Sequence, residues 1–349
     1  MVREHQSIET LDASAPSTGG SERRRTRDRL ILLFKLTVAT ALVTLLIRSD
    51  QLDLRQFGRI ENVPLALLAL AAVLGAFLVS TIRWQGILRS LAVPVTAGEP
   101  LRISWLGLLG SQFLPGVTGG DLLRGAAIAR QVPERRGLAI LSVIVDRGIG
   151  LVGLLWIATI ALVLAPPELR SDPVVGTVTR SIAGLGLIGT VGLILLCWER
   201  TWRLPIVRQL VDSEAERGAV VRRLIAALQL FRGRGKVVTI ALGWSLIAHG
   251  LTIVAAATIA RANWGVTASI LDFALLVPVG QLAAALPITP GGVGVGEFVY
   301  ETLFATLGVS QGAELSLWLR VLHATTALGA IPLALAHTLR QRGRVAARA

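Results

Sequence analysis

Long apolar runs separated by short arginine-rich segments constrain this chain more than any other feature. A helix needs about 20 apolar residues to cross the hydrocarbon core of a bilayer. Only 16% of the residues are charged, against about 25% in a soluble domain. The sequence therefore predicts an all-α polytopic membrane protein. Six full spans are expected, at residues 30–48, 63–83, 137–165, 174–198, 237–260 and 313–338.

Two further apolar regions are interrupted by proline and glycine, and their halves are too short to cross the bilayer singly. The halves are residues 99–114 with 117–130, and residues 270–286 with 297–311. Non-helical backbone at membrane depth is tolerated where it is buried in protein or lines a wet cavity. Each region is predicted to form a hairpin, either re-entrant or made of two short spanning helices, and the lengths favour re-entrance.

The distribution of arginine and lysine orients these spans. Five arginines lie between residues 23 and 29, nine basic residues in 199–236 and four in 339–349, whereas 299–312 has none. Positive charge favours the inner side of a cell membrane, so both termini are expected in the cytoplasm. The first hairpin then opens on the cytoplasmic face and the second on the external face. A disordered tail (1–28) and a basic tail (341–349) would flank a transmembrane domain (29–340).

The two interruptions share a pattern. Leu114-Pro-x-x-x-Gly-Gly120 leads to Asp121, and Leu286-Pro-x-x-x-Gly-Gly292 leads to Glu297. Because the two hairpins enter from opposite sides, the pattern predicts an inverted repeat. In transporters built in this way, broken helices mark the substrate site.

Ionisable side chains inside the predicted spans are candidates for function, because burying a charge in a membrane is costly. Asp121 and Arg124 are three residues apart and share a helix face. Asp146 and Arg147 lie near the midplane and diverge on their helix, so each is expected to reach a different partner. We expect Asp146 to reach an arginine, and Arg147 a carboxylate such as Asp121 or Glu297. The alternatives are a local helix-capping pair and a purely structural salt bridge.

The glycines beside the two acidic residues would let a lipid headgroup approach the backbone closely. A carboxylate at a helix start counts against a simple phosphate cradle, so a cationic or hydroxyl-bearing headgroup, or a proton, fits better; a hinge without ligand is the alternative. Arg320 and His323 share a face of the last helix, where His323 alone would be a core histidine. Arg83-Trp84 is typical of an interfacial anchor. The candidate substrate-binding residues are Asp121, Arg124, Asp146, Arg147, Glu297, Gly119, Gly120, Gly291, Gly292 and Arg320.

Several classes of function are not expected. The net charge of +13 is placed to face the anionic inner leaflet rather than nucleic acid, and residues 220–231 form a basic amphipathic stretch suited to that surface. The single cysteine, Cys197, excludes an intramolecular disulfide and a CxxC metal site. No nucleotide, metalloprotease or nucleophile-elbow motif occurs. We therefore expect neither metal nor cofactor, and the chain is more consistent with a non-enzyme.

The segments FLPGVTGGDLLR (113–124), DRGIG (146–150) and PITPGGVGVGE (287–297), with the arginine-bearing last helix, resemble the lysylphosphatidylglycerol synthase transmembrane family. In full-length relatives this flippase-like domain moves aminoacylated phosphatidylglycerol between leaflets, and a separate domain performs the aminoacyl transfer. The present sequence ends at Ala349, so the resemblance implies translocation without lysyl transfer.

We expect a translocator of a phospholipid or lipid-linked headgroup that hydrolyses no ATP. An intramembrane enzyme, or the membrane module of one, acting on a lipid or lipid-linked sugar is the alternative. A third interpretation makes the chain a partner of a separate lipid-modifying enzyme. Neither the lipid nor the oligomeric state follows from the sequence.

Overall fold

The computed structural model describes residues 62–113, 119–165, 173–205, 228–286 and 288–329, together with residue 167 and scattered helical positions between 30 and 48. Every regular element in these ranges is helical. The predicted tails, the two prolines at positions 115 and 287, and most of the stretch 220–231 lie outside the described residues. So does the second part of the predicted last span.

Four helices in the described residues are long and apolar enough to cross a membrane. They contain 28, 29, 25 and 30 residues, or about 38–45 Å at 1.5 Å per residue. These helices confirm the predicted all-α multi-pass architecture, while the count of six spans stays a prediction. They are α2 (Val63–Ser90), α5 (Arg136–Leu164), α7 (Pro173–Cys197) and α10 (Gly235–Trp264).

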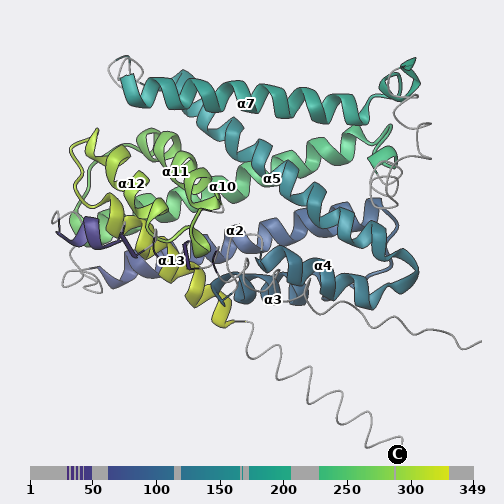
Figure 1. The fold of residues 1–349 in the computed structure, drawn as a ribbon, viewed down its shortest axis with the longest axis horizontal. Coiled ribbons are helices and arrows are strands. Elements are labelled where there is room, and N and C mark those ends of the chain that lie inside the picture. The colour runs from purple at the N-terminus through teal and green to yellow at the C-terminus, as the bar shows by residue number, and fades with distance from the viewer. Residues whose placement is uncertain are drawn as a thin grey trace, which may run out of the picture.

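Small residues allow the long helices to approach one another closely. Helices α2 and α10 pack along each other, and Ala69 and Ala256, one from each helix, are fully buried. Helix α5 packs against α10, with Gly153 beside the Ser245 side chain. Small residues are the usual contact surface between helices in membranes. Helix α7 packs mainly on α5 and lies at the edge of the molecule (Figure 1).

The first hairpin consists of α3 (Glu99–Phe113) and α4 (Gly119–Gln131). The two helices are 15 and 13 residues long, about 23 and 20 Å, which is short of a 30 Å hydrocarbon core. The two helices approach each other so closely that a Cβ atom on Gly120 would collide with the Gly107 carbonyl oxygen. A 3₁₀ turn, η1 (Pro133–Arg135), then leads into α5.

The second hairpin consists of α11 (Ile270–Ala285) and α12 (Val295–Ala305), with the 3₁₀ turn η4 (Pro290–Gly292) between them. A capping box begins α11, in which Ser269 and Asp272 exchange side-chain and backbone hydrogen bonds. Gly280 of α11 leaves space for the Tyr300 ring of α12. The two helices, of 16 and 11 residues, are also too short to cross the core upright.

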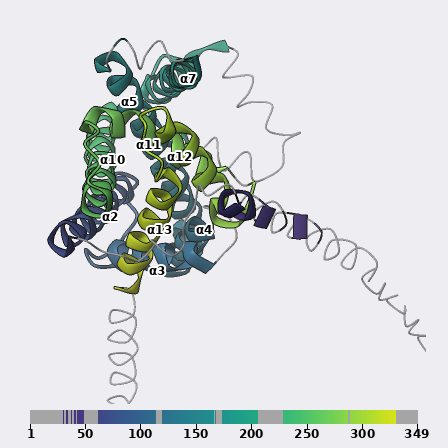
Figure 2. The same cartoon turned by 90° about the vertical axis from the view of Figure 1, so that its left-hand side faces the viewer.

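The two hairpins lie toward opposite ends of the long helices (Figure 1). Helix α13 (Gly312–Leu328) follows α12 and packs on both α12 and α3. The Trp105 Nε1 of α3 donates a hydrogen bond of 2.9 Å to the Thr326 carbonyl of α13. Helix α13 therefore links the two hairpins, as the second view also shows (Figure 2).

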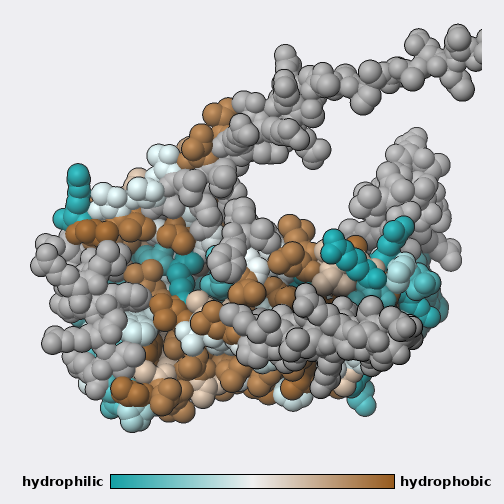
Figure 3. All heavy atoms as spheres, turned by 90° about the horizontal axis from the view of Figure 1, so that it is seen from below, coloured by the Kyte–Doolittle hydropathy of each residue, from teal (hydrophilic) through white to brown (hydrophobic). Residues whose placement is uncertain are grey.

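The face of the molecule drawn in Figure 3 is largely apolar in its middle. Apolar side chains cover much of the middle, and hydrophilic ones gather at the end that carries the turn between α4 and α5 (Figure 3). Glu134, Arg135 and Arg136 are exposed in that turn. This division is what a bilayer requires, because its core offers no partner to an exposed charge.

Candidate functional site

A buried carboxylate in the middle of α5 is the centre of the larger of two buried ion-pair clusters among the described residues. Asp146 is 1% exposed. Its Oδ1 accepts a hydrogen bond of 2.8 Å from Arg83 Nε of α2, and its Oδ2 accepts one of 3.2 Å from Arg124 Nη2 of α4. The expectation that Asp146 reaches an arginine is confirmed, and two arginines from two other helices meet it.

A second carboxylate extends this network toward the surface. Asp121, in the first turn of α4, contacts Arg124 Nη1 at 3.4 Å. Its other oxygen pairs with Arg147 Nε, which confirms the expected pairing of Arg147 with a carboxylate. We call Arg83, Asp121, Arg124, Asp146 and Arg147 the Asp146 cluster.

Uncharged side chains hold two of these arginines in place. Arg83 Nη1 donates a hydrogen bond of 2.8 Å to Ser245 Oγ of α10. The Arg124 guanidinium lies 4.3 Å from the centre of the Trp84 ring, within the range of a cation–π contact. Trp84 Nε1 in turn donates to Ser142 Oγ at 3.0 Å.

The interpretation of Arg83-Trp84 as an interfacial anchor is wrong. Arg83 is only 7% exposed and Trp84 is fully buried. The helix continues for seven residues beyond Arg83 to Ser90, about 10 Å, so Arg83 lies well inside it. The sequence signal for this was that apolar residues, Ile87 and Leu88, continue beyond Arg83, and both are fully buried in the structure.

The second cluster surrounds Glu297, which is fully buried in the first turn of α12. Its Oε1 accepts hydrogen bonds from Arg320 Nε at 2.7 Å and Ser316 Oγ at 3.2 Å, both of α13. Its Oε2 accepts one from the Gly294 amide at 2.6 Å. Arg320 Nη1 also donates to the Gly291 carbonyl at 2.6 Å. These five residues form the Glu297 cluster.

The candidate glycines shape the hairpins. Gly119 and Gly120 are buried, and Gly120 faces the α3 backbone. Gly291 and Gly292 have φ of +62° and +70°, values that favour glycine. A Cβ atom on Gly292 would collide with the Ala284 carbonyl oxygen of α11. The structure thus gives Gly120 and Gly292 a packing role, and their predicted contact with a headgroup stays a prediction.

The structure separates the predicted site residues into two groups. In the described part of the chain, no hydrogen bond or ion pair joins Glu297 to the Asp146 cluster. His323 Nδ1 contacts the Leu319 carbonyl of its own helix at 2.7 Å, whereas Arg320 turns to Glu297. The described residues contain no group of three or more His, Cys, Asp or Glu that could hold a metal ion.

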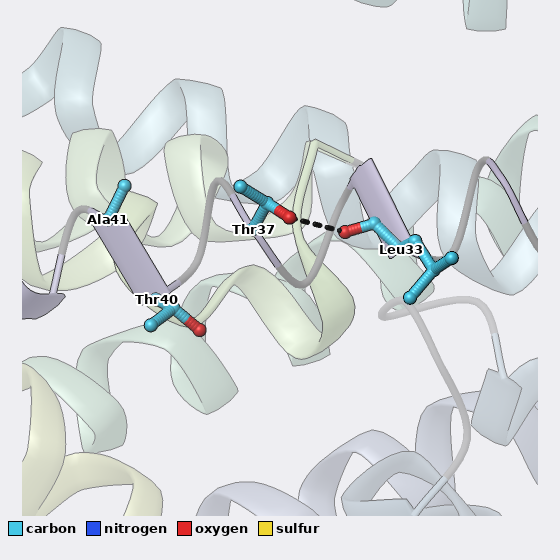
Figure 4. Close-up of a pocket in the computed structure, with 4 residues that line it drawn as sticks. All are labelled: Leu33, Thr37, Thr40 and Ala41. Carbon is cyan, nitrogen blue, oxygen red and sulfur yellow. Dashed lines mark hydrogen bonds between the residues drawn. The ribbon is translucent and has the colours of Figure 1, made fainter.

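One cavity of about 400 Å³ lies away from both clusters. Its described lining is Leu33, Thr37, Thr40 and Ala41, and Thr37 Oγ1 donates to the Leu33 carbonyl at 2.9 Å (Figure 4). That hydroxyl is satisfied by its own helix, and the described lining contains no charged side chain, so it offers little specific chemistry to a ligand.

The fold and its charged clusters define a polytopic α-helical membrane protein with ion pairs buried inside its bundle. Comparison with protein families then identifies it more closely. The chain belongs to the family described as the lysylphosphatidylglycerol synthase TM region, whose sequence model matches residues 32–332. The resemblance inferred from the motifs is therefore confirmed. No curated protein and no solved structure matched the chain.

Proposed function

We propose that this protein moves a phospholipid or a lipid-linked headgroup between the two leaflets of the cell membrane without hydrolysing ATP. The observation that carries the proposal is the presence of an ion-pair cluster on each of two half-length hairpins. The Asp146 cluster includes Asp121 and Arg124 of α4, and the Glu297 cluster begins α12. The hairpins lie toward opposite ends of the long helices (Figure 1).

The cost of burying these charges supports a functional role. Taking ions out of water costs several kcal/mol each, and pairing them repays that cost only in part. A bundle that needed only stability would do as well with apolar side chains at these positions. A headgroup that crosses the bilayer, by contrast, requires polar partners along its way while the acyl chains stay in lipid.

The connection between the clusters supports their acting together. Helix α13 carries Arg320 of the Glu297 cluster and contacts α3 of the first hairpin through Thr326 and Trp105. A change in one hairpin can therefore be transmitted to the other through α13. In this proposal the hairpins open in turn toward opposite leaflets, and both termini lie in the cytoplasm.

The family also supports lipid as the substrate, because its description refers to the transmembrane region of a phosphatidylglycerol-modifying synthase. No observation among the described residues favours an intramembrane enzyme over translocation. Each buried carboxylate of the two clusters is occupied by arginines or by backbone and hydroxyl donors.

A scrambling assay tests the proposal. The purified full-length chain would be reconstituted in vesicles that contain fluorescent phosphatidylglycerol or phosphatidylcholine, and the fraction bleached by an impermeant reductant would be followed in time. We expect the protein to accelerate lipid exchange, and Asp121→Asn or Glu297→Gln to abolish that acceleration with expression unchanged. Arg180→Gln, at an exposed position of α7, is the matched control. Wild-type rates in both acidic-site variants would refute the proposal.

A further inference from the structure

The Asp146 cluster contains more positive than negative charge. Its three arginines face two carboxylates among the described residues, which leaves a net charge of +1. The Glu297–Arg320 pair, in contrast, is neutral. An uncompensated cation within a membrane is costly, so a net-anionic ligand would complete the Asp146 cluster electrostatically.

The excess charge is accessible at one residue. The Arg147 side chain is 53% exposed, whereas the other four side chains of the cluster are at most 15% exposed. Arg147 is the twelfth residue of α5, about 17 Å from the start of a helix about 43 Å long. Its guanidinium is thus presented near mid-depth.

Arg147 has donors to spare. Arginine carries five N–H donors. Among the three side-chain nitrogens of Arg147, only Nε has a partner in the described residues, and that partner is the Asp121 carboxylate. Arg124, on the other side of the same carboxylate, has a buried Nε without a hydrogen-bond partner. Of these two guanidinium groups, Arg147 is the exposed one, and planar guanidinium groups bind phosphate oxygens bidentately.

The surface around Arg147 is apolar. Ile144 and Leu151 lie three and four residues away on the same face of α5 and are 54% and 48% exposed. On α4, Leu122 follows Asp121, the partner of Arg147, and is 71% exposed. These side chains suit acyl chains, so the surface fits an amphiphile rather than a free ion.

We propose that Arg147 binds the phosphate of a net-anionic phospholipid whose acyl chains lie on the apolar faces of α4 and α5, and that the buried Arg124 contributes positive charge from behind Asp121. The negative charge of one phosphodiester balances the excess charge of the Asp146 cluster, and a zwitterionic headgroup brings no net charge to do so. This site names the substrate class of the translocator, and so rests on the proposed function. It also reverses the preference for a cationic headgroup that the carboxylates suggested from sequence, because both carboxylates are already paired with arginine.

Lipid binding to the purified full-length chain, measured by native mass spectrometry, tests the site independently of transport. The chain would be titrated with phosphatidylglycerol and with phosphatidylcholine of identical acyl chains. We expect phosphatidylglycerol to bind about tenfold more tightly or better, because the choline ammonium of phosphatidylcholine brings a positive charge to a cluster that already has an excess of one. Arg147→Gln should remove this preference, Arg147→Lys should keep part of it, and Arg180→Gln should leave it intact.

Equal affinity for the two lipids, or an undiminished preference in Arg147→Gln, would overturn the site. Displacement of phosphatidylglycerol by millimolar inorganic phosphate would show a site for free phosphate and would also overturn it. The failure of the proposed function is distinguishable, because a protein that binds phosphatidylglycerol selectively but does not accelerate scrambling would disprove translocation alone.

Discussion

Both ion-pair clusters provide a buried carboxylate with partners, but the partners come from different parts of the chain. The Asp146 cluster draws charged groups from α2, α4 and α5, and the residues that meet lie up to 63 positions apart in sequence. The Glu297 cluster lies within residues 291–320, and part of its hydrogen bonding comes from the backbone of the interrupted segment. One cluster is therefore a product of helix assembly, and the other is largely a product of one hairpin and the helix after it.

The difference extends to charge and exposure. The Asp146 cluster has an excess guanidinium that reaches the surface at Arg147, whereas Glu297 is matched by one arginine, two-thirds buried. The Gly294 backbone amide also donates a hydrogen bond to Glu297, and it adds no net charge. The comparison indicates that the Asp146 cluster is built to receive an anion and that the Glu297 cluster is already complete.

The largest expected effect is on stability at the two central carboxylates. Asp146→Asn leaves Arg83 without a charge partner in a buried site and leaves Arg124 with Asp121 alone, which costs about 3–5 kcal/mol. Glu297→Gln should cost less, about 1–3 kcal/mol, because Arg320 is 29% exposed and keeps its hydrogen bond to the Gly291 carbonyl, whereas Arg83 is 7% exposed. Thermal unfolding of each variant in one detergent would measure the difference.

A second substitution sharpens that result. Adding Arg83→Gln to Asp146→Asn removes the cation that has lost its charge partner, so the double variant should recover part of the lost stability. Equal losses in Asp146→Asn and Glu297→Gln, with no recovery in the double variant, would remove the energetic distinction between the clusters.

The next effect concerns the glycines that close the hairpins. Gly120→Ala should destabilise the protein by about 1–3 kcal/mol, because the new methyl group meets the Gly107 backbone. Gly292→Ala should cost about 1 kcal/mol more, since its φ of +70° also disfavours a side chain. Denaturant unfolding would rank the two. Gly125→Ala is the control, because nothing lies near its Cβ position; a loss there as large as at Gly120 would contradict the packing role.

The smallest expected losses of stability come from substituting the uncharged side chains that contact the two clusters. Trp84→Phe removes the hydrogen bond to Ser142 and weakens the contact with Arg124, for about 1–2 kcal/mol. Ser316→Ala removes one of several donors to Glu297 and should cost about 1 kcal/mol or less. Unfolding midpoints in detergent would check this order, and a larger loss for Ser316→Ala would reverse it.

Much of the architecture follows from the order of apolar residues, because a bilayer admits few ways to satisfy the backbone. Helices α2, α5, α7 and α10 appear where the runs were found, and both interruptions separate short helices. The pairing of Arg147 with a carboxylate was also predicted from the sequence, because Arg147 and its neighbour Asp146 point apart on the helix and need different partners. The prediction for Arg83 was wrong because the predicted span ended at residue 83, where an arginine resembles a surface anchor, whereas α2 continues to Ser90.

By itself, then, the sequence determined that two acidic residues begin the second helices of two short hairpins inside a membrane protein. Hydrophobic runs and positions of proline and glycine are local properties, and they are sufficient for that conclusion. Only the tertiary structure decided that Asp121 and Glu297 belong to different clusters, and that Arg83 and Arg124 meet on Asp146. Ion pairing depends on distances between helices far apart in the chain, and these distances are set by how the small residues of α2, α3, α4, α5 and α10 pack.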